Sequence, residues 1–493
     1  MKLVLRGHDE RYTVEQSLMN LFPGELPVYA AIEPGDGSWA VVTCQEEADG
    51  RLTVTTDLAY GGGKNSAFFT TLLSGSDFDR EGQRRHAVAA CFYQAALELL
   101  EAPPPWGMLT GVRPDKPAAW AVMAGKSLRE ARRMLEETYF VSPSRAALAA
   151  ETGGMAAEAA RELEPRDIAV YIGIPFCPTR CAYCSFVSQS VEKSFALIAP
   201  YADALIREIR AGGEMVRRQG LRVRALYMGG GTPTTLTAEQ LDQVLTAFEE
   251  SFDTAHCGEI TVEAGRPDTI TAEKLAVLKA RGVTRVSVNP QSMEDRVLRA
   301  IGRNHTAGDI DRAMELTARY GFPHVNMDLI AGLPADSPEG FRWSLDACLA
   351  YGTDNVTVHT LALKKGSRIL TEGLSVPPPE AVAEMLDYAG PALRAAGHRP
   401  YYLYRQKYMS GSFENIGWCH PKSACLYNIY IMSELCSILS FGAGGSTKMV
   451  EPGTNHIERA FNVKYPKEYT ERPEKCLGNQ QLFAAFYENL FPA

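Results

Sequence analysis

From about residue 168, short runs of apolar and β-branched residues alternate with longer segments of helical periodicity, and no other feature limits the possible folds so strongly. Six such runs occur, at residues 168–174, 223–229, 259–265, 285–290, 324–330 and 355–361. Apolar strands that alternate with helices predict βαβ units around a parallel sheet. Six successive units predict an α/β fold built on a partial (β/α)6 barrel of the TIM type, with its chemistry at the C-terminal ends of the strands.

The rest of the chain predicts two further domains, in keeping with a length of 493 residues. Residues 1–165 predict an N-terminal α+β accessory domain, residues 166–375 the barrel, and residues 376–493 a mainly helical C-terminal cap that contributes to substrate binding. The N-terminal domain is predicted to hold strands at 26–34, 38–45 and 51–60 and helices at 81–100, 118–139 and 143–162.

Composition argues against several classes of protein. The formal net charge of −9 disfavours a nucleic-acid partner bound through phosphate neutralisation. The sequence has no run of about 18 uncharged apolar residues, as a membrane span would need, and its first residues do not resemble a signal peptide. The eleven cysteines are too irregularly spaced for a disulfide framework, so we expect reduced thiols in a soluble, cytoplasmic protein.

Three cysteines lie directly after the first predicted barrel strand, in the stretch YIGIPFCPTRCAYCSF. Cys177, Cys181 and Cys184 are separated by three residues and then by two. Three thiolates can hold three irons of a [4Fe–4S] cluster and leave the fourth iron open. Two alternatives remain at this point, a zinc site and three unrelated buried thiols, although structural zinc generally has four protein ligands.

This cysteine spacing resembles the signature of the radical S-adenosylmethionine (SAM) superfamily. Tyr171, the following IPFC and Tyr183 inside the loop resemble the oxygen-independent coproporphyrinogen III oxidase family, and the PPWGMLTGVRP segment resembles its HemZ-type dehydrogenase branch. The resemblance implies that SAM chelates the open iron and that one electron cleaves its sulfur–C5′ bond to give a 5′-deoxyadenosyl radical. It also implies a reducing electron donor such as flavodoxin or ferredoxin.

The resemblance further implies SAM-binding residues near the strand ends. The glycines of GGGTPT would let backbone groups approach the methionine end of SAM, because glycine has no Cβ in the way. Glu263 is expected near the amino group, Gln291 and Arg303 near the carboxylate or ribose, and Ala362 beside the adenine. Asp328 interrupts an apolar strand, and ribose hydroxyls would satisfy its buried carboxylate. The full predicted set is Tyr171, Tyr183, Gly229, Gly230, Gly231, Thr232, Glu263, Gln291, Arg303, Asp328 and Ala362.

The substrate implied by the resemblance is coproporphyrinogen III, whose propionates would lose carbon dioxide and become vinyl groups. Arg405 and Lys407, set among tyrosines, are candidates to bind the anionic propionates, with Arg113 as a further one. The chain departs from the well-studied oxidase at two positions of the cysteine motif. Gly173 replaces a His and Phe186 replaces a further Cys, so the loop identifies the cofactor better than the substrate.

Three alternatives remain open. The chain could be a haem chaperone, with His359 or His420 as axial ligands, or a radical methyltransferase that acts on haem or another large ring. Cys419, His420 and Cys425 could also bind a second metal.

Overall fold

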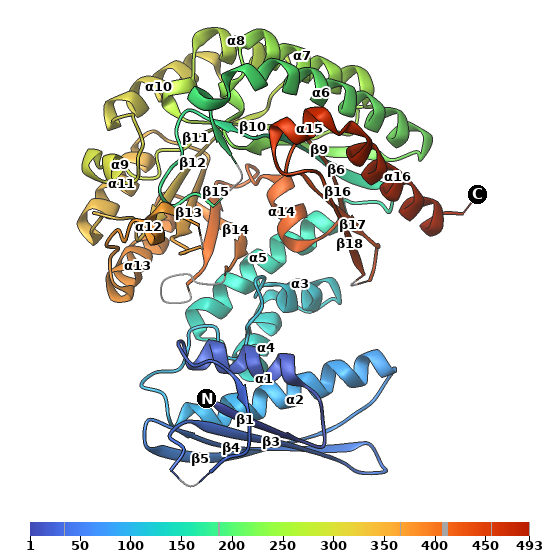
Figure 1. Cartoon of the computed structure of the whole chain (residues 1–493), viewed down its shortest axis with the longest axis vertical. Coiled ribbons are helices and arrows are strands. Elements are labelled where there is room, and N and C mark those ends of the chain that lie inside the picture. Colours follow the sequence, from blue (N-terminus) through green and yellow to red (C-terminus); the bar gives the residue numbers. More distant parts are fainter. Residues whose placement is uncertain (34, 186–187, 365, 407–412, 455, 493) are drawn as a thin grey trace. The chain divides into compact units, whose positions relative to one another are not determined.

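The structure, a computed structural model, describes all residues except 34, 186–187, 365, 407–412, 455 and 493. Phe186 and Lys407, both named above, therefore lie outside the described residues. The chain divides into two compact units, Met1–Gly153 and Gly154–Ala493, and each holds a large sheet of its own (Figure 1). None of the helices that the structure describes is long and apolar enough to cross a membrane.

The N-terminal unit is an α+β fold around a five-stranded sheet with the order β2-β1-β3-β4-β5. The strands are β1 (Lys2–Arg6), β2 (Val28–Tyr29), β3 (Trp39–Glu46), β4 (Arg51–Tyr60) and β5 (Gly63–Leu72). Helices α1 (Arg11–Leu21) and α2 (Asp77–Leu97) pack their apolar side chains against this sheet. Within the strand predicted at 26–34, the described residues form a strand only at Val28–Tyr29, and Pro27 directly before it cannot donate a ladder hydrogen bond.

The single helix predicted at 118–139 is wrong, because the structure has two helices there. Helix α3 (Lys116–Met123) ends before Gly125, whose φ of +90° belongs to the left-handed region that glycine tolerates. Ser127 then starts α4 (Leu128–Tyr139) with a reciprocal capping box to Glu130. Helix α5 (Pro143–Arg161) follows as predicted.

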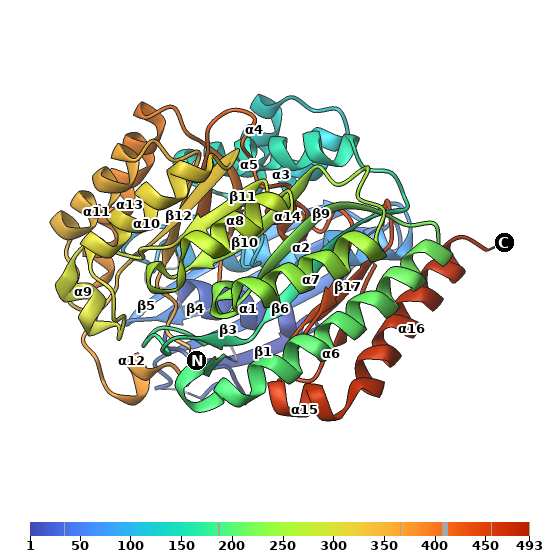
Figure 2. The same ribbon diagram turned by 90° about the horizontal axis from the view of Figure 1, so that it is seen from above.

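In the second unit all six predicted barrel strands are present, and each pairs in parallel with the next. They are β6 (Asp167–Ile174), β9 (Arg222–Gly230), β10 (Glu259–Gly265), β11 (Arg285–Val288), β12 (His324–Ala331) and β13 (Asn355–Thr360). Helices along the outer face include α6 (Val191–Arg218), α7 (Ala238–Ser251), α8 (Ala272–Ala280), α10 (Ala307–Tyr320) and α11 (Pro338–Ala350) (Figures 1 and 2).

The C-terminal segment is helical in part, and it also adds five strands to the barrel sheet, which the sequence did not predict. These are β14 (Arg399–Tyr404), β15 (Asn415–Cys419), β16 (Ser437–Phe441), β17 (Ser446–Val450) and β18 (Ile457–Phe461). Strand β16 pairs in parallel with β6, whereas β15 pairs antiparallel with β13. Its helices are α13 (Pro379–Ala395), α14 (Leu426–Ser433), α15 (Pro466–Glu471) and α16 (Pro473–Leu490), and the short α12 (Arg368–Thr371) precedes the segment.

Five barrel strands carry a half-buried side chain toward their C-terminal ends, within otherwise mostly buried runs. These residues, which we call the inner patch, are Tyr171, Tyr227, Glu263, Asp328 and His359. Tyr171 lies beside Tyr227 in the strand register, and the register of β12 and β13 brings Asp328 near His359. The sheet therefore gathers one set of polar side chains where chemistry is expected in this fold.

Candidate functional site

The cysteine loop, residues 177–184, begins in the short strand β7 (Phe176–Cys177), just after β6. Backbone hydrogen bonds attach the loop to two segments that are distant in the sequence. The Ala182 N–H donates to the Ile301 carbonyl oxygen at 2.9 Å, and the Ile369 N–H donates to the Ala182 carbonyl oxygen at 3.2 Å. All three cysteines are free thiols. The loop thus lies at the predicted end of the barrel, held from two sides.

The surroundings of two of the thiols differ. Burial raises the pKa of Cys177, partly offset by a hydrogen bond that Thr232 Oγ1 donates to its sulfur at 3.6 Å. Burial also acts against the Cys181 thiolate, yet the charges of Arg303 and Arg266 hold the pKa of that thiol below its ordinary value. An electropositive setting of this kind favours thiolates as metal ligands.

The glycines after β9 are required by close packing. A Cβ on Gly231 would lie 2.5 Å from the Phe176 carbonyl oxygen, and one on Gly229 would lie 3.0 Å from the Glu263 carboxyl group. Gly230 has a φ of +105° and would bring a Cβ within 3.1 Å of the Tyr171 hydroxyl. These glycines therefore bring β9 against the cysteine loop and the inner patch, and their predicted contact with SAM stays a prediction.

Glu263 lies among tyrosines on the inner patch. The Tyr227 hydroxyl donates to its Oε1 at 2.5 Å. Burial raises the pKa of Glu263 to about 7, although the bond from Tyr227 opposes that shift, and the nearby Asp328 raises it further. The ring of Tyr427, from α14, stacks on Tyr227 with centroids 4.6 Å apart and on Tyr171 at 6.2 Å. A carboxyl group of this kind titrates near neutral pH and can bind an amino group.

Asp328 and His359 form the other half of the inner patch. His359 Nε2 lies 3.8 Å from Asp328 Oδ2, and the Tyr404 hydroxyl lies 3.4 Å from His359 Nδ1. Asn326 donates to Asp328 at 2.8 Å. Burial acts to raise the pKa of Asp328, but the His359 and Asn326 contacts keep it below its ordinary value. Asp328 is thus an ionised acceptor with its own protein partners.

Gln291 and Arg303 connect this region to the cysteine loop. Gln291 has a φ of +67°, rare for a residue other than glycine, and its backbone bonds to Asp328 and Ile330 at 2.9 and 3.0 Å. Buried Arg303 donates to the Asn289 carbonyl at 2.5 Å and to the Tyr183 hydroxyl at 3.2 Å. Two distant predicted residues, Tyr183 and Arg303, therefore touch.

The candidate substrate residue Arg405 and the predicted adenine neighbour Ala362 lie just beyond the ends of β14 and β13. Arg405 follows β14 and is 9% exposed, and burial lowers the pKa of its guanidinium to about 10. Tyr401 and Tyr402, which precede Arg405 in the chain, are buried in the core. Ala362 lies two residues beyond β13, and Arg113 belongs to the N-terminal unit.

Close packing explains why a glycine stands at position 173, and the sequence alone could not show this. The Tyr201 hydroxyl donates to its carbonyl at 2.7 Å, and a Cβ at this position would lie 3.3 Å from the Phe441 carbonyl oxygen. Gly442, with a φ of +93°, approaches the Gly173 carbonyl so closely that a Cβ there would lie 2.4 Å away. The loop after β16 therefore occupies space that a larger residue at 173 would need.

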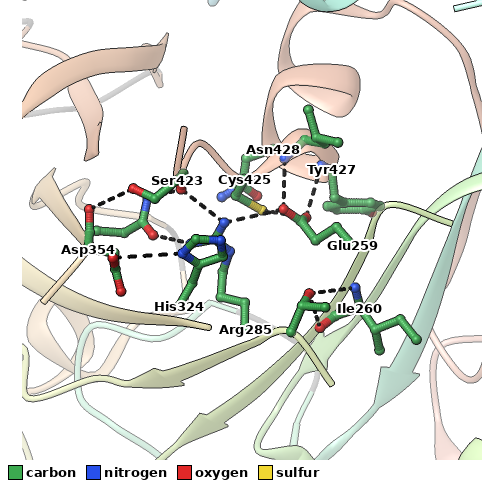
Figure 3. Close-up of polar contacts among 12 residues, drawn as sticks. Glu259, Ile260, Arg285, His324, Asp354, Ser423, Cys425, Tyr427 and Asn428 are labelled. Carbon is green, nitrogen blue, oxygen red and sulfur yellow. Dashed lines mark hydrogen bonds and ion pairs between the residues drawn. The ribbon is translucent and has the colours of Figure 1, made fainter. Parts of the chain in front are cut away.

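The segment with Cys419, His420 and Cys425 lies at the opposite, N-terminal ends of the strands, because Cys419 pairs with Asn355, the first residue of β13. Figure 3 shows Cys425 in this region. There Glu259 accepts hydrogen bonds from the Cys425 thiol at 3.1 Å and from the backbone N–H groups of Leu426 and Tyr427 at 3.0 and 3.3 Å. Arg285 Nη2 lies 3.4 Å from Glu259. This polar network fastens the start of α14, and thereby places the ring of Tyr427 on the inner patch.

Comparisons with known proteins agree with this geometry. The model of the radical SAM superfamily matches residues 171–348. The Bacillus subtilis oxygen-independent coproporphyrinogen-III oxidase-like protein HemZ is 35% identical over 486 residues, which cover 96% of each chain. This chain belongs to that oxidase-like family of radical SAM proteins.

Two further proteins are similar to parts of this chain. The heme chaperone HemW of Mycobacterium tuberculosis is 31% identical over 311 residues, or 61% of this chain and 73% of its own. The solved structure of coproporphyrinogen III oxidase (HemN) from Escherichia coli has a TM-score of 0.52 and 23% identity, and the match covers 65% of this chain and 72% of HemN. That likeness shows that the radical SAM fold is shared.

Radical SAM proteins use a [4Fe–4S] cluster and SAM, and the residues here fit both. Cys177, Cys181 and Cys184 would hold the cluster, and the two arginines beside them suit an anionic group. No three His, Cys, Asp or Glu side chains in the described part of the chain converge on one metal ion. Three cluster thiolates bind three different irons, so they stand further apart than the ligands of one ion. When bound, the cluster supplies the electron that cleaves SAM.

Several site residues were missed from the sequence. In the sequence, Tyr227 and Tyr427 look like ordinary positions of an apolar strand and helix, so neither was predicted as a site residue. Arg266, directly after β10, is 3% exposed. A signal existed only for Arg266, because an arginine at the end of an apolar parallel strand is unusual and its charge must find a partner.

Proposed function

We propose that this chain is a radical SAM oxidoreductase that converts propionates of coproporphyrinogen III into vinyl groups and so yields protoporphyrinogen IX. The observation that carries this proposal is the 35% identity, over 96% of both chains, with a relative named for oxygen-independent coproporphyrinogen-III oxidase. The radical SAM fold shared with HemN supports it.

The chemistry gives each part of the site a role. The 5′-deoxyadenosyl radical takes a hydrogen atom from the propionate β-carbon and becomes 5′-deoxyadenosine. The substrate radical then loses carbon dioxide and passes one electron to an acceptor, which leaves a vinyl group. We assign Glu263 to the SAM amino group, Arg303 and Gln291 to its carboxylate or ribose, and Asp328 to the ribose hydroxyls. The stacked tyrosines of the inner patch exclude water beside these groups.

A direct experiment tests this reaction. Reduced, cluster-loaded protein is incubated without oxygen with SAM and coproporphyrinogen III, and the products are separated by chromatography. We expect 5′-deoxyadenosine and protoporphyrinogen IX, and neither from a variant with Ala at Cys177, Cys181 and Cys184. A methylated tetrapyrrole would instead identify a radical methyltransferase.

A haem chaperone is the second candidate, because several relatives carry that name, including HemW of M. tuberculosis at 31% identity. Tight haem binding without SAM cleavage would favour it. His359 could serve as an axial ligand if one ring nitrogen left its present neighbour, Asp328 or Tyr404, so His359→Ala should weaken haem binding if this candidate is right. For either function we infer a cytoplasmic protein, and for the oxidoreductase a flavodoxin or ferredoxin as electron donor.

A further inference from the structure

Two buried guanidinium groups flank the cysteine loop. Arg266 is 3% exposed and Arg303 is 7% exposed. Arg266 pairs with Asp268, whereas Arg303 has no carboxylate within ion-pair distance among the residues that the structure describes. A buried cation is costly unless an anion or strong acceptors compensate it. The surroundings of the loop therefore carry an excess of positive charge.

His305 does not balance this charge. It is 4% exposed, and neither of its ring nitrogens has a hydrogen-bond partner within the described ranges. Burial, followed by the charges of Arg303 and Arg266, lowers the pKa of its imidazole to about 3. His305 is therefore neutral, and the two guanidinium groups act on the cysteine loop with Asp268 as their main counter-charge.

Arg266 is held in a fixed orientation that reaches the cysteine loop. Its Nε and Nη2 donate to the two carboxylate oxygens of Asp268 at 2.9 and 2.8 Å, and this bidentate geometry fixes the plane of the guanidinium. Its Nη1 donates to Thr179 Oγ1 at 2.9 Å, and that hydroxyl donates to the Gly302 carbonyl at 3.0 Å. Thr179 lies midway between Cys177 and Cys181.

We propose that Arg266 is a positioning residue for the iron–sulfur cluster: through Thr179 it fixes the loop between Cys177 and Cys181, and its charge makes the cluster easier to reduce. Reduction adds one electron, supplied by an external reductant, and breaks no bond. A nearby positive charge stabilises the more negative product, and net charge and hydrogen bonding both tune cluster potentials. At an effective dielectric constant of about 20, a unit charge within about 10 Å of the cluster changes the equilibrium constant for its reduction by about tenfold.

Substitutions can separate the effect of the Arg266 charge from the effect of its hydrogen bond to Thr179. Arg266→Gln removes both, Arg266→Lys keeps the charge but loses the bidentate fork, and Asp268→Asn removes the counter-charge. Thr179→Val cuts the contact with the loop and leaves the charge. The matched control is Arg281→Gln, since Arg281 bonds to Asp242 and Glu249 near the opposite ends of the strands and its loss changes the net charge equally.

The readouts are the midpoint potential of the reconstituted cluster, from redox titration followed by electron paramagnetic resonance, and iron per chain. We expect Arg266→Gln to lower the equilibrium constant for cluster reduction by about tenfold, which lowers the midpoint potential by about 59 mV for one electron. Arg266→Lys should stay within about threefold of the parent, and Asp268→Asn should shift the potential upward. Thr179→Val should lower the iron content while the potential of the clusters that form stays unchanged.

Equal potentials for the parent, Arg266→Gln, Asp268→Asn and Arg281→Gln would overturn the proposal. If Arg266→Gln fails to fold or to hold iron, Asp268→Asn and Arg266→Lys still test the charge effect. The titration needs no tetrapyrrole, so its result does not depend on whether coproporphyrinogen III is the substrate.

Discussion

The replacement Glu263→Gln offers the sharpest test of the proposed SAM site in the inner patch. Glu263 accepts a hydrogen bond from Tyr227 at 2.5 Å, and burial raises the pKa of its carboxyl group to about 7. If the ionised form binds the SAM amino group, affinity must follow its ionisation. The carboxylate is about one-tenth ionised at pH 6 and about nine-tenths ionised at pH 8. This group alone should then make SAM binding about tenfold tighter at pH 8 than at pH 6.

The assay is the dissociation constant of SAM for cluster-loaded protein, measured by equilibrium dialysis between pH 6 and pH 8. Other titrating groups, including SAM itself, affect the wild type and Glu263→Gln alike, so the ratio of their constants isolates Glu263. At pH 8 the variant should bind about tenfold to a hundredfold more weakly, as expected for loss of a charged hydrogen bond. The ratio of the variant's dissociation constant to that of the wild type should be about tenfold smaller at pH 6 than at pH 8. A ratio that stays constant across this range would refute the assignment.

The ionisation of Glu263 should act in opposite directions on binding and on folding: as pH rises, it strengthens SAM binding but lowers the free energy of unfolding. The folded-state pKa of Glu263 lies above the ordinary value of 4.5, so its stabilising contribution is complete below about pH 4.5 and is lost as pH rises through 7. Relative to Glu263→Gln, the wild type should lose up to about 3 kcal/mol of unfolding free energy over that range. Urea unfolding of the cluster-free proteins at pH 5 and pH 8 measures this difference.

Two further substitutions test the packing that builds the site. Gly231→Ala should destabilise the chain by about 1–3 kcal/mol and lower its iron content, because the new Cβ would lie 2.5 Å from the Phe176 carbonyl oxygen. Gly258→Ala, whose nearest neighbour would be 3.8 Å away, is the control, and equal melting temperatures for the two variants would contradict this prediction. Arg285→Gln should cost about 3–5 kcal/mol in urea unfolding, because it leaves the buried Glu259 carboxylate without its cation. A cost below about 1 kcal/mol would mean that the network of Figure 3 does not hold α14 in place.

The sequence predicts the barrel well because its signal is local. Each of the six parallel strands is a short stretch rich in apolar and β-branched residues that can be recognised without its neighbours, such as IAVYIGI in β6. The cysteine loop is likewise a contiguous motif. The break between α3 and α4 could have been predicted, since Gly125 and the capping pair Ser127 and Glu130 stand in the sequence.

The rest depends on contacts between residues far apart in the chain. Strand β16 forms beside β6 only because the chain returns some 260 residues later, and no pattern in SILSF specifies that partner. Tyr427 reaches the inner patch because Glu259 fastens the start of α14. The hydrogen bond between Arg266 and Thr179 also joins two segments that the sequence alone does not bring together.

The central claim is that the radical generated here abstracts hydrogen from a propionate side chain, and isotope transfer tests it most directly. Coproporphyrinogen III deuterated at the propionate β-carbons is incubated with SAM and the reduced protein, and 5′-deoxyadenosine is analysed by mass spectrometry. We predict one deuterium in each 5′-deoxyadenosine and one such molecule for every vinyl group formed. Unlabelled 5′-deoxyadenosine, or labelled product without vinyl groups, would contradict it.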